Sequence, residues 1–233
     1  MKLINEQIHR QFSIQKPDNI PMLAHIDTHT HNLQSNNPFA IINVPILQIK
    51  ETLLAAKSGF YSVGIHPWDA HNTDSSMLDV LEEALADGSV KAIGECGFDR
   101  NAKASFKEQG YFFERQILLS EKHQKPLIIH CVAAFNELIL LRKRFAATQN
   151  WILHGYRGKP DMALQLLRHG FAISYGEKFN PQSLQVTPLD KLCIETDTSA
   201  IPIDDLFRQI AALKNCCPDE LNAACSLLKL YVC

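Results

Sequence analysis

Short apolar runs alternate with longer, helix-like stretches along most of this chain. Each run is apolar at nearly every position, which is typical of parallel strands that are buried on both faces. The pattern predicts eight strands, which are Leu23–Asp27, Phe39–Val44, Tyr61–Ile65, Val90–Gly94, Leu127–Cys131, Trp151–His154, Phe171–Ser174 and Leu192–Glu195.

The segments between these runs carry apolar residues at helical spacing. In Phe106–His123, the residues Phe112, Phe113 and Ile117 fall on one side of a helix and charged residues fall on the other. The other predicted helices are Ser76–Leu85, Ala134–Phe145, Asp161–Leu167, Asp204–Leu213 and Asp219–Tyr231. Strand and helix that alternate about eight times predict an α/β fold, namely an irregular TIM-like (β/α) barrel in a single domain. The irregularity is expected at Asn32–Pro38, which is too short for a full helix.

Length and composition agree with one such barrel. The chain has 233 residues, of which 46% are hydrophobic and 21% are charged, and no linker or low-complexity tract divides it. The formal net charge is -2, so no general positive field would attract nucleic acid. Any phosphate binding must therefore come from a local site or from metal.

The cysteines and the apolar runs bear on the location of the protein. No pair among the seven cysteines has C-x-x-C spacing, and Cys96, Cys131 and Cys193 lie in or beside apolar runs, which indicates free thiols in a reducing compartment. The first twenty residues contain no secretory apolar region, and no run approaches the roughly 20 residues of a membrane span. We therefore expect a cytoplasmic protein without a membrane partner.

Several predicted strands end in residue types that bind metals. In a (β/α) barrel the carboxyl ends of all strands meet on one face, where active sites are built. The residues at these ends are Asp27, His29, His31, His66, Glu95, Asp99, His130, His154, Glu195 and Asp197. A single histidine at a strand end is more often a hydrogen-bonded core or surface residue. Burying the whole set without partners would be costly, which favours a shared metal site.

His29 and His31 form the most specific part of this pattern. Side chains two apart on a strand point the same way and lie about 6–7 Å apart, so both imidazoles can bind one metal ion. Histidines from other strands and two carboxylates supply enough ligands for two divalent ions, which a carboxylate such as Glu95 can bridge at about 3.5–4 Å. Imidazole and carboxylate ligands without thiolate favour zinc, manganese or similar ions.

In these residues the chain resembles the TatD-type metal-dependent hydrolases, the TatD-related deoxyribonuclease branch of the amidohydrolase-like barrels. The matching segments are Ile26–His31 (IDTHTH), Ser62–Pro67 (SVGIHP), Ala92–Asp99 (AIGECGFD), Lys125–Cys131 (KPLIIHC), Leu153–Gly155 (LHG) and Ile194–Asp197 (IETD). They follow one another in the order typical of the family and span residues 26–197, which is most of the chain.

The resemblance implies a ligand role for six of the matching polar residues. One metal ion would be held by His29, His31 and Asp197, the second by His130 and His154, and Glu95 would bridge the two. The implied cofactors are thus two divalent ions, and zinc, magnesium, manganese and nickel all suit such ligands.

The family acts mostly on nucleic acids, as magnesium- or zinc-dependent deoxyribonucleases and 3′-exonucleases. The implied reaction is hydrolysis of a phosphodiester in DNA or RNA by a hydroxide that the two metals generate from water. Asp197 would orient this hydroxide and relay its proton, Glu95 would hold both metals, and His66 would contact the phosphate or assist the leaving oxygen. The implied partners are nucleic-acid ends or a small phosphodiester, with no obligate protein partner.

The chain departs from the family pattern around the substrate. Trp68 stands where the family commonly has a second histidine, and it would either stack on a base or cap the barrel rim. The family often has an arginine within a few residues after the histidine equivalent to His130, where it could bind phosphate, but this chain has none there. Arg157 or Lys159 would replace this phosphate clamp unless both are solvated loop charges. Asp99 is retained and would orient a metal ligand by a hydrogen bond without binding the metal itself.

Domain limits and two other functions stay open. Residues 1–22 precede the usual start of the family, so we expect an N-terminal extension followed by the hydrolase barrel at 23–233. The same two metals would serve a hydrolase of a small-molecule amide or ester, which the net charge of -2 and the missing arginine after His130 favour. A non-catalytic metal-binding relative would instead have closed metal sites without an open pocket.

Overall fold

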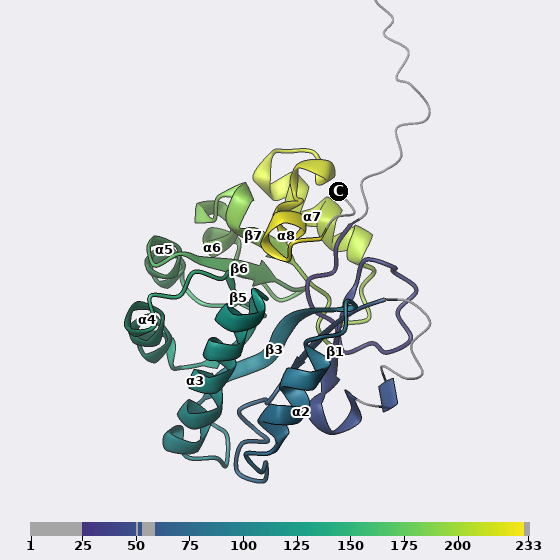
Figure 1. Cartoon of the computed structure of the whole chain (residues 1–233). Coiled ribbons are helices and arrows are strands. Elements are labelled where there is room, and N and C mark those ends of the chain that lie inside the picture. The colour runs from purple at the N-terminus through teal and green to yellow at the C-terminus, as the bar shows by residue number, and fades with distance from the viewer. Residues whose placement is uncertain (1–24, 50, 53–58, 231–233) are drawn as a thin grey trace, which may run out of the picture.

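One parallel sheet forms the centre of the molecule (Figure 1). The computed structural model describes residues 25–49, 51–52 and 59–230. The strands are β1 (Ile41–Pro45), β2 (Phe60–Gly64), β3 (Val90–Asp99), β4 (Leu127–Val132), β5 (Trp151–Leu153), β6 (Phe171–Tyr175) and β7 (Leu192–Ile194). Each strand pairs in parallel with the strand before it along the chain, and helices connect most of them, so the predicted α/β barrel fold is confirmed.

The segment 27–31 lies between β7 and β1 and closes the ring. On one side the amide of Thr28 donates to the carbonyl of Ile194 in β7 at 2.9 Å. On the other side Thr30 donates to Ile41 at 3.0 Å and accepts from Asn43 at 2.8 Å, both in β1. Because it is hydrogen-bonded on both edges, this segment takes the place of an eighth strand.

The first predicted strand is therefore displaced along the chain. The prediction covers Leu23–Asp27, whereas among the described residues from 25 onward the pairing begins at Asp27, whose carbonyl accepts from the amide of Ile41 at 2.8 Å. Leu23, Ala24 and the predicted extension 1–22 lie outside the described residues. An apolar run indicates that a strand is present, but the pairing register depends on which backbone groups face the neighbouring edges.

Most helices lie outside the sheet along its circumference (Figure 1), whereas α8 packs against the inward-facing residues of the strands. They are η1 (Ile46–Gln48), α2 (Met77–Ala84), α3 (Phe106–His123), α4 (Phe135–Arg144), α5 (Pro160–Arg168), α6 (Pro181–Val186), η2 (Leu189–Lys191), α7 (Ile203–Lys214), η3 (Pro218–Glu220) and α8 (Ala223–Leu227). The predicted helix Phe106–His123 has the bounds of α3, and α2, α4, α5 and α7 also agree closely with the prediction. The short helix α6 has no predicted counterpart. None of the helices among the described residues is long and apolar enough to cross a membrane.

The predicted C-terminal helix Asp219–Tyr231 is wrong as one element. It is divided into η3 and α8, and Leu221 and Asn222 turn the chain between them. Leu221 packs in the apolar layer between the sheet and its outer helices, whereas Leu227 packs inside the ring of strands. A single straight helix could not bury both leucines in these two places.

The inside of the ring has an apolar layer and a polar layer. The apolar layer includes Ile41, Ala92, Ile128, Ile152, Ala172 and Cys193, which pack against Ala223, Ala224 and Leu227 of α8. Two residues further along the same strands or just beyond them stand Asn43, His130, His154, Ser174 and Glu195. Side chains two apart on a strand point the same way, so the inner face changes from apolar to polar toward the carboxyl ends of the strands. The polar layer holds the candidate site.

The described cysteines match the prediction of free thiols. Cys96, Cys131, Cys193, Cys216 and Cys217 form no disulfide. Burial raises the pKa of the Cys193 thiol to about 12 and raises that of Cys96 further. These two side chains therefore pack as small apolar groups rather than as reactive thiolates.

Candidate metal centre

The carboxylate of Glu95 lies at the centre of the histidine cluster. Its Oε2 atom is 2.9 Å from Nε2 of His31 and 3.4 Å from Nε2 of His29. Its Oε1 atom is 2.8 Å from Nε2 of His154 and 3.5 Å from Nδ1 of His130. Each oxygen thus faces a different pair of imidazoles, as expected of a carboxylate that bridges two cations.

Asp197 and His66 lie beside the same cluster. Oδ1 of Asp197 is 3.6 Å from Nε2 of His31, and Nε2 of His66 is 3.8 Å from Oε1 of Glu95. Three groups of possible ligand atoms lie within 4.8 Å of one another: His29, His31 and Asp197; His29, Glu95 and His154; and His66, Glu95 and His130. The structure therefore brings all six predicted ligands together with His66.

Two of the histidines form hydrogen bonds through the ring nitrogen that faces away from Glu95, which leaves the lone pair of the other ring nitrogen directed toward Glu95. Nε2 of His130 is 2.9 Å from Oδ2 of Asp99, and Nδ1 of His154 is 3.3 Å from Oε1 of Glu195. A carboxylate can only accept, so these nitrogens carry protons, and in neutral rings the opposite nitrogens present lone pairs to Glu95. Lone pairs that face a carboxylate repel it unless a cation lies between them. The donor set therefore fits a divalent metal.

The acidic groups of the centre favour positive charge on its histidines. Burial opposes the charging of His154, but Glu95 and Glu195 outweigh it and raise the pKa of His154 well above its ordinary value. The hydrogen bond to Glu95 also raises the pKa of His31. Burial disfavours the Glu95 carboxylate, yet His29 and His154 hold its pKa well below the usual range. A metal ion competes with these protons, so its affinity should fall as the pH falls.

Asn43 and Glu195 support the ligands; the sequence predicts Glu195 only as one of the strand-end carboxylates, without a role, and does not predict Asn43. The side-chain amide of Asn43 donates to Oε2 of Glu95 at 3.2 Å, and its Oδ1 accepts from the Glu95 amide at 3.0 Å. Oε1 of Glu195 accepts from the Gly155 amide at 2.7 Å while it faces His154. The available signal for Asn43 is that it is the single polar residue in the apolar run Phe39–Val44.

Asp27 joins the segment 27–31 to the residues that follow β7. Its two oxygens accept from the amide of Thr196 at 2.9 Å and from the Thr196 hydroxyl at 2.6 Å. Burial raises the pKa of Asp27 to about 7, although the bonds from Thr196 favour its charged form. This contact fixes the chain next to His29 and Asp197, so Asp27 has a positioning role and belongs to none of the three groups of possible ligand atoms.

Two buried glutamines of α3 hold the ends of β2 and β3. Gln116 accepts from the amide of Ile65 at 2.8 Å and donates to its carbonyl at 3.1 Å. Gln109 accepts from the amide of Asp99 at 2.8 Å and donates to its carbonyl at 3.0 Å. Because they are seven residues apart, both glutamines lie on the same side of α3, and they satisfy backbone groups that the sheet no longer pairs.

An irregular register in β3 directs Glu95 into the ring. Between Ile93 and Cys96 the strand advances one residue further than its neighbour β4, which is the effect of a β-bulge. A side chain at Gly94 would bring its Cβ atom to 2.4 Å from the carbonyl of Ile128, and one at Gly97 to 2.2 Å from that of His130. Only glycine permits these approaches, so the motif glycines allow β3 to lie against β4 at the site.

A pocket of about 440 Å³ opens over the cluster. It is lined by His31, Asn43, Val44, Pro45, Gly64, His66, Trp68, Asp69, Glu95, His130, His154, Asp197 and Thr198. Trp68 is exposed at the rim of this pocket, a position that suits both sequence-based interpretations, stacking on a base and capping the barrel rim. The volume lies within the roughly 300–1,000 Å³ of pockets that bind small ligands.

Arg157 and Lys159 differ in position. Arg157 lines a second pocket, which shares Asp197 and Thr198 with the pocket over the cluster. Lys159 lines neither of these two pockets and directly precedes α5 as an exposed residue. Of the two basic residues that the sequence offers as a phosphate clamp, Arg157 is therefore the one near the metal centre.

Comparison with known proteins identifies the same relatives as the sequence motifs. A family model described as TatD related DNase matches residues 26–226. An uncharacterized metal-dependent hydrolase of Haemophilus influenzae is 28% identical over 61% of this chain and 60% of its own length. A 3′-5′ ssDNA/RNA exonuclease TatD of Klebsiella pneumoniae is 26% identical over 74% of this chain and 70% of its own length. The chain thus spans about three fifths of the Haemophilus relative.

A solved structure shares the fold. The crystal structure of YjjV, a TatD homologue from Escherichia coli, superposes with a TM-score of 0.73 at 20% sequence identity. The match covers 89% of this chain and 96% of the other. Since so few residues are identical, the likeness concerns the arrangement of strands and helices.

Proposed function

Because this chain belongs to the TatD-related DNase family, we propose that it is a metal-dependent hydrolase that cleaves phosphodiester bonds in DNA or RNA strands. One observation carries the proposal: the two oxygens of Glu95 face different pairs of imidazoles at distances between 2.8 and 3.5 Å. Relatives that bear nuclease names supply the substrate class. The free thiols are in keeping with a reducing compartment, and we propose the cytoplasm.

Two divalent ions are proposed for this centre. One would be held by His29, His31 and Asp197, the other by His130 and His154, with Glu95 between them. Zinc, magnesium, manganese and nickel all suit a set of imidazole and carboxylate ligands. When bound, such ions would supply Lewis acidity toward water and toward the oxygens of a phosphate group.

His66 is proposed to donate a hydrogen bond to the substrate. Burial lowers the pKa of His66 to about 4, so its ring is neutral at neutral pH. The backbone amide of Trp68 donates to Nδ1 of His66 at 3.1 Å, so the single ring proton resides on Nε2. Nε2 faces the pocket and can therefore donate to a phosphate oxygen or to the leaving oxygen.

Asp197 is proposed to accept the proton of the attacking water. Its side chain is 24% exposed and lines both pockets. It is therefore in contact with the ligand cluster and with solvent. A carboxylate in this position can orient water through a hydrogen bond and then pass the proton to bulk solvent.

The test is hydrolysis of single-stranded DNA and RNA oligonucleotides by the full chain, loaded in turn with zinc, magnesium, manganese and nickel. We expect release of nucleotides with at least one metal, and we expect Asp197→Asn to abolish it. Asp161→Asn, which changes an exposed carboxylate in the first turn of α5, is the matched control and should remain active. Intact strands with every metal would refute the nuclease proposal.

A small-molecule hydrolase is the second candidate. The formal net charge of -2 favours it, because the chain has no general attraction for a polyanionic strand. Screening the same metal-loaded protein against cyclic amides and esters separates the two candidates. Turnover of such a compound, together with intact nucleic acid, would support the second candidate over the first.

A further inference from the structure

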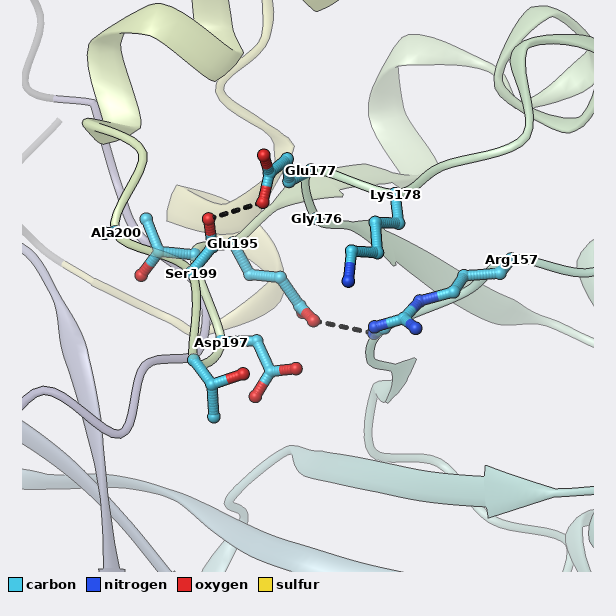
Figure 2. A pocket seen from close by; sticks show the side chains of 11 residues that line it. Arg157, Gly176, Glu177, Lys178, Glu195, Asp197, Ser199 and Ala200 are labelled. Atoms are coloured by element: carbon cyan, nitrogen blue, oxygen red, sulfur yellow. Dashed lines mark hydrogen bonds between the residues drawn. The ribbon is translucent and has the colours of Figure 1, made fainter.

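A second pocket adjoins the metal centre, and its lining includes two basic side chains that form no ion pair among the described residues. It has a volume of about 250 Å³ and is lined on one side by Arg157 and Lys178. Asp197 and Thr198 belong to its wall and also to the wall of the pocket over the metal centre. Figure 2 shows the side chains of Arg157 and Lys178 extending into this pocket toward the carboxylate of Glu195, with Asp197 on the far side of it. We call it the Arg157–Lys178 pocket.

The two cations of this pocket have no partner in the part of the chain that the structure describes. Within residues 25–49, 51–52 and 59–230, no hydrogen bond or ion pair joins the guanidinium of Arg157 or the ammonium of Lys178 to another group. Other exposed arginines are paired: Arg100 with Glu137, Arg144 with Glu114, and Arg208 with Asp205. Arg157 and Lys178 are therefore available to a ligand.

Each carboxylate of the pocket makes a polar contact through at least one oxygen, while Oε2 of Glu195 is buried without a hydrogen-bond partner among the described residues. Oε2 of Glu177 accepts from the hydroxyl of Ser199 at 2.7 Å (Figure 2). Glu195 is buried, accepts from the amide of Gly155 at 2.7 Å and faces His154 at 3.3 Å. Asp197 belongs to the ligand cluster described above. The arginine and the lysine are thus the groups in this pocket that remain free to recognise an anion.

Two neighbouring cations suit a phosphate group. The planar guanidinium of arginine can bind two phosphate oxygens at once, and the lysine ammonium adds a compact charge. The volume is about eight times the ~30 Å³ that a water molecule occupies in the liquid, so a phosphate enters easily. A nucleic-acid strand carries a phosphate at every nucleotide, so a strand with one phosphate over the metals presents another close by.

We propose that the Arg157–Lys178 pocket binds a second phosphate of the substrate, adjacent to the phosphate held at the metal centre. The inference rests on the proposed function and deepens it, because it names the substrate as a strand or nucleotide with two neighbouring phosphates. It also explains how a chain with a net charge of -2 binds a polyanion, because Arg157 and Lys178 form a local pair of cations. A diester with a single phosphate would leave the pocket unused.

The test compares product-like ligands that differ in one phosphate. Thymidine 3′,5′-bisphosphate and the 3′- and 5′-monophosphates are titrated into the metal-loaded full chain by isothermal calorimetry. We expect the bisphosphate to bind at least about tenfold more tightly than either monophosphate, because hydrogen bonds to charged groups are stronger than those between neutral groups; tenfold corresponds to about 1.4 kcal/mol. Arg157→Met and Lys178→Met should each remove most of this advantage.

Matched controls come from the last turns of two helices, away from the carboxyl ends of the strands. Lys143→Met in α4 and Arg168→Met in α5 also remove one exposed cation each, and they should keep the bisphosphate advantage. Equal binding of bisphosphate and monophosphates overturns the inference, as does an advantage that survives both Arg157→Met and Lys178→Met.

The two proposals fail in distinguishable ways. If the bisphosphate advantage depends on Arg157 and Lys178 but no strand is cleaved with any metal, the second phosphate site stands and the nuclease proposal fails. If strands are cleaved but the second phosphate adds no affinity, the nuclease proposal stands and the Arg157–Lys178 pocket has another role.

Discussion

The indole N–H of Trp68 donates a hydrogen bond to Oδ2 of Asp99 at a distance of 2.7 Å. The same oxygen lies 2.9 Å from Nε2 of His130. The Trp68 side chain is also 59% exposed, although its N–H reaches a buried carboxylate. One residue at the pocket rim therefore contacts solvent and, through Asp99, holds a candidate metal ligand in its orientation.

We expect Asp99→Asn to weaken metal binding about 10- to 100-fold, the range found for groups that hold a metal ligand from behind. The neutral amide of this variant would replace the charged carboxylate that accepts from Trp68 and His130. The proton on Nε2 of His130 and the orientation of its ring would then no longer be fixed. Trp68→Phe keeps an aromatic ring but loses the N–H, so a smaller, several-fold loss is expected. Competition with a chelating dye measures both affinities.

Trp68→Ala distinguishes the two roles of this residue. Stacking on a base is worth about 1–3 kcal/mol, so loss of the ring should raise the KM for a strand beyond the effect of Trp68→Phe. Unchanged metal affinity in Trp68→Phe would mean that Trp68 does not support His130. Equal KM values for the two variants would argue against stacking.

Glu95→Gln should reduce the metal content and the activity together. A neutral amide cannot bridge two cations, so we expect fewer than two ions per chain by elemental analysis. The kcat/KM for oligonucleotides should fall by at least about 100-fold, because the loss of a ligand exceeds the effect of removing its support. Glu82→Gln, which changes a surface ion pair with Lys122, is the control and should retain both properties. Full metal content in Glu95→Gln would contradict the bridging role.

Removal of metal should destabilise the fold. A ligand present at 100 times its Kd stabilises a folded protein by about 2.7 kcal/mol, and each kcal/mol shifts the Tm of a domain of this size by about 2–4 °C. Treatment with a chelator should therefore lower the Tm by roughly 5–10 °C, as measured by scanning calorimetry. The shift should shrink in Glu95→Gln. An unchanged Tm after chelation of a metal-loaded sample would speak against a metal held by the folded cluster.

Gln116→Leu should destabilise the protein although leucine suits a buried helix face. The change leaves the amide and the carbonyl of Ile65 without their side-chain partner. An unsatisfied buried polar group typically costs about 1–3 kcal/mol, and urea unfolding measures this difference. Gln182→Leu, at an exposed position of α6, is the control and should change the free energy of unfolding by less than about 0.5 kcal/mol. Equal stability of both variants would remove the proposed role of Gln116.

Local patterns were sufficient for the elements and for the chemistry of the strand ends. The bounds of α3 followed from apolar residues at helical spacing, and in the structure Ser105 and Glu108 cap its first turn. His29 and His31 could be paired because alternation along an extended segment is a short-range property. The convergence of His130 and His154 followed from the barrel, in which the carboxyl ends of all strands meet.

Contacts between distant elements were beyond such patterns. Asn43 looked like an isolated polar residue in an apolar run, and its bonds to Glu95 join residues 52 positions apart. Gln116 lies on the buried side of α3, where its partner at the end of β2 depends on how the helix packs. Lys178 carried no sequence signal, because only the folding of β5 and β6 side by side places it beside Arg157.

By itself, then, the order of residues determined a ring of parallel strands and the ligand types at its carboxyl end, since periodicity and residue chemistry are local. The tertiary structure decided which oxygen of Glu95 faces which imidazoles, where the ring closes between β7 and β1, and which cations adjoin the centre. These relations depend on strand register, a bulge and loop paths, which are set by packing and backbone hydrogen bonds across the whole fold.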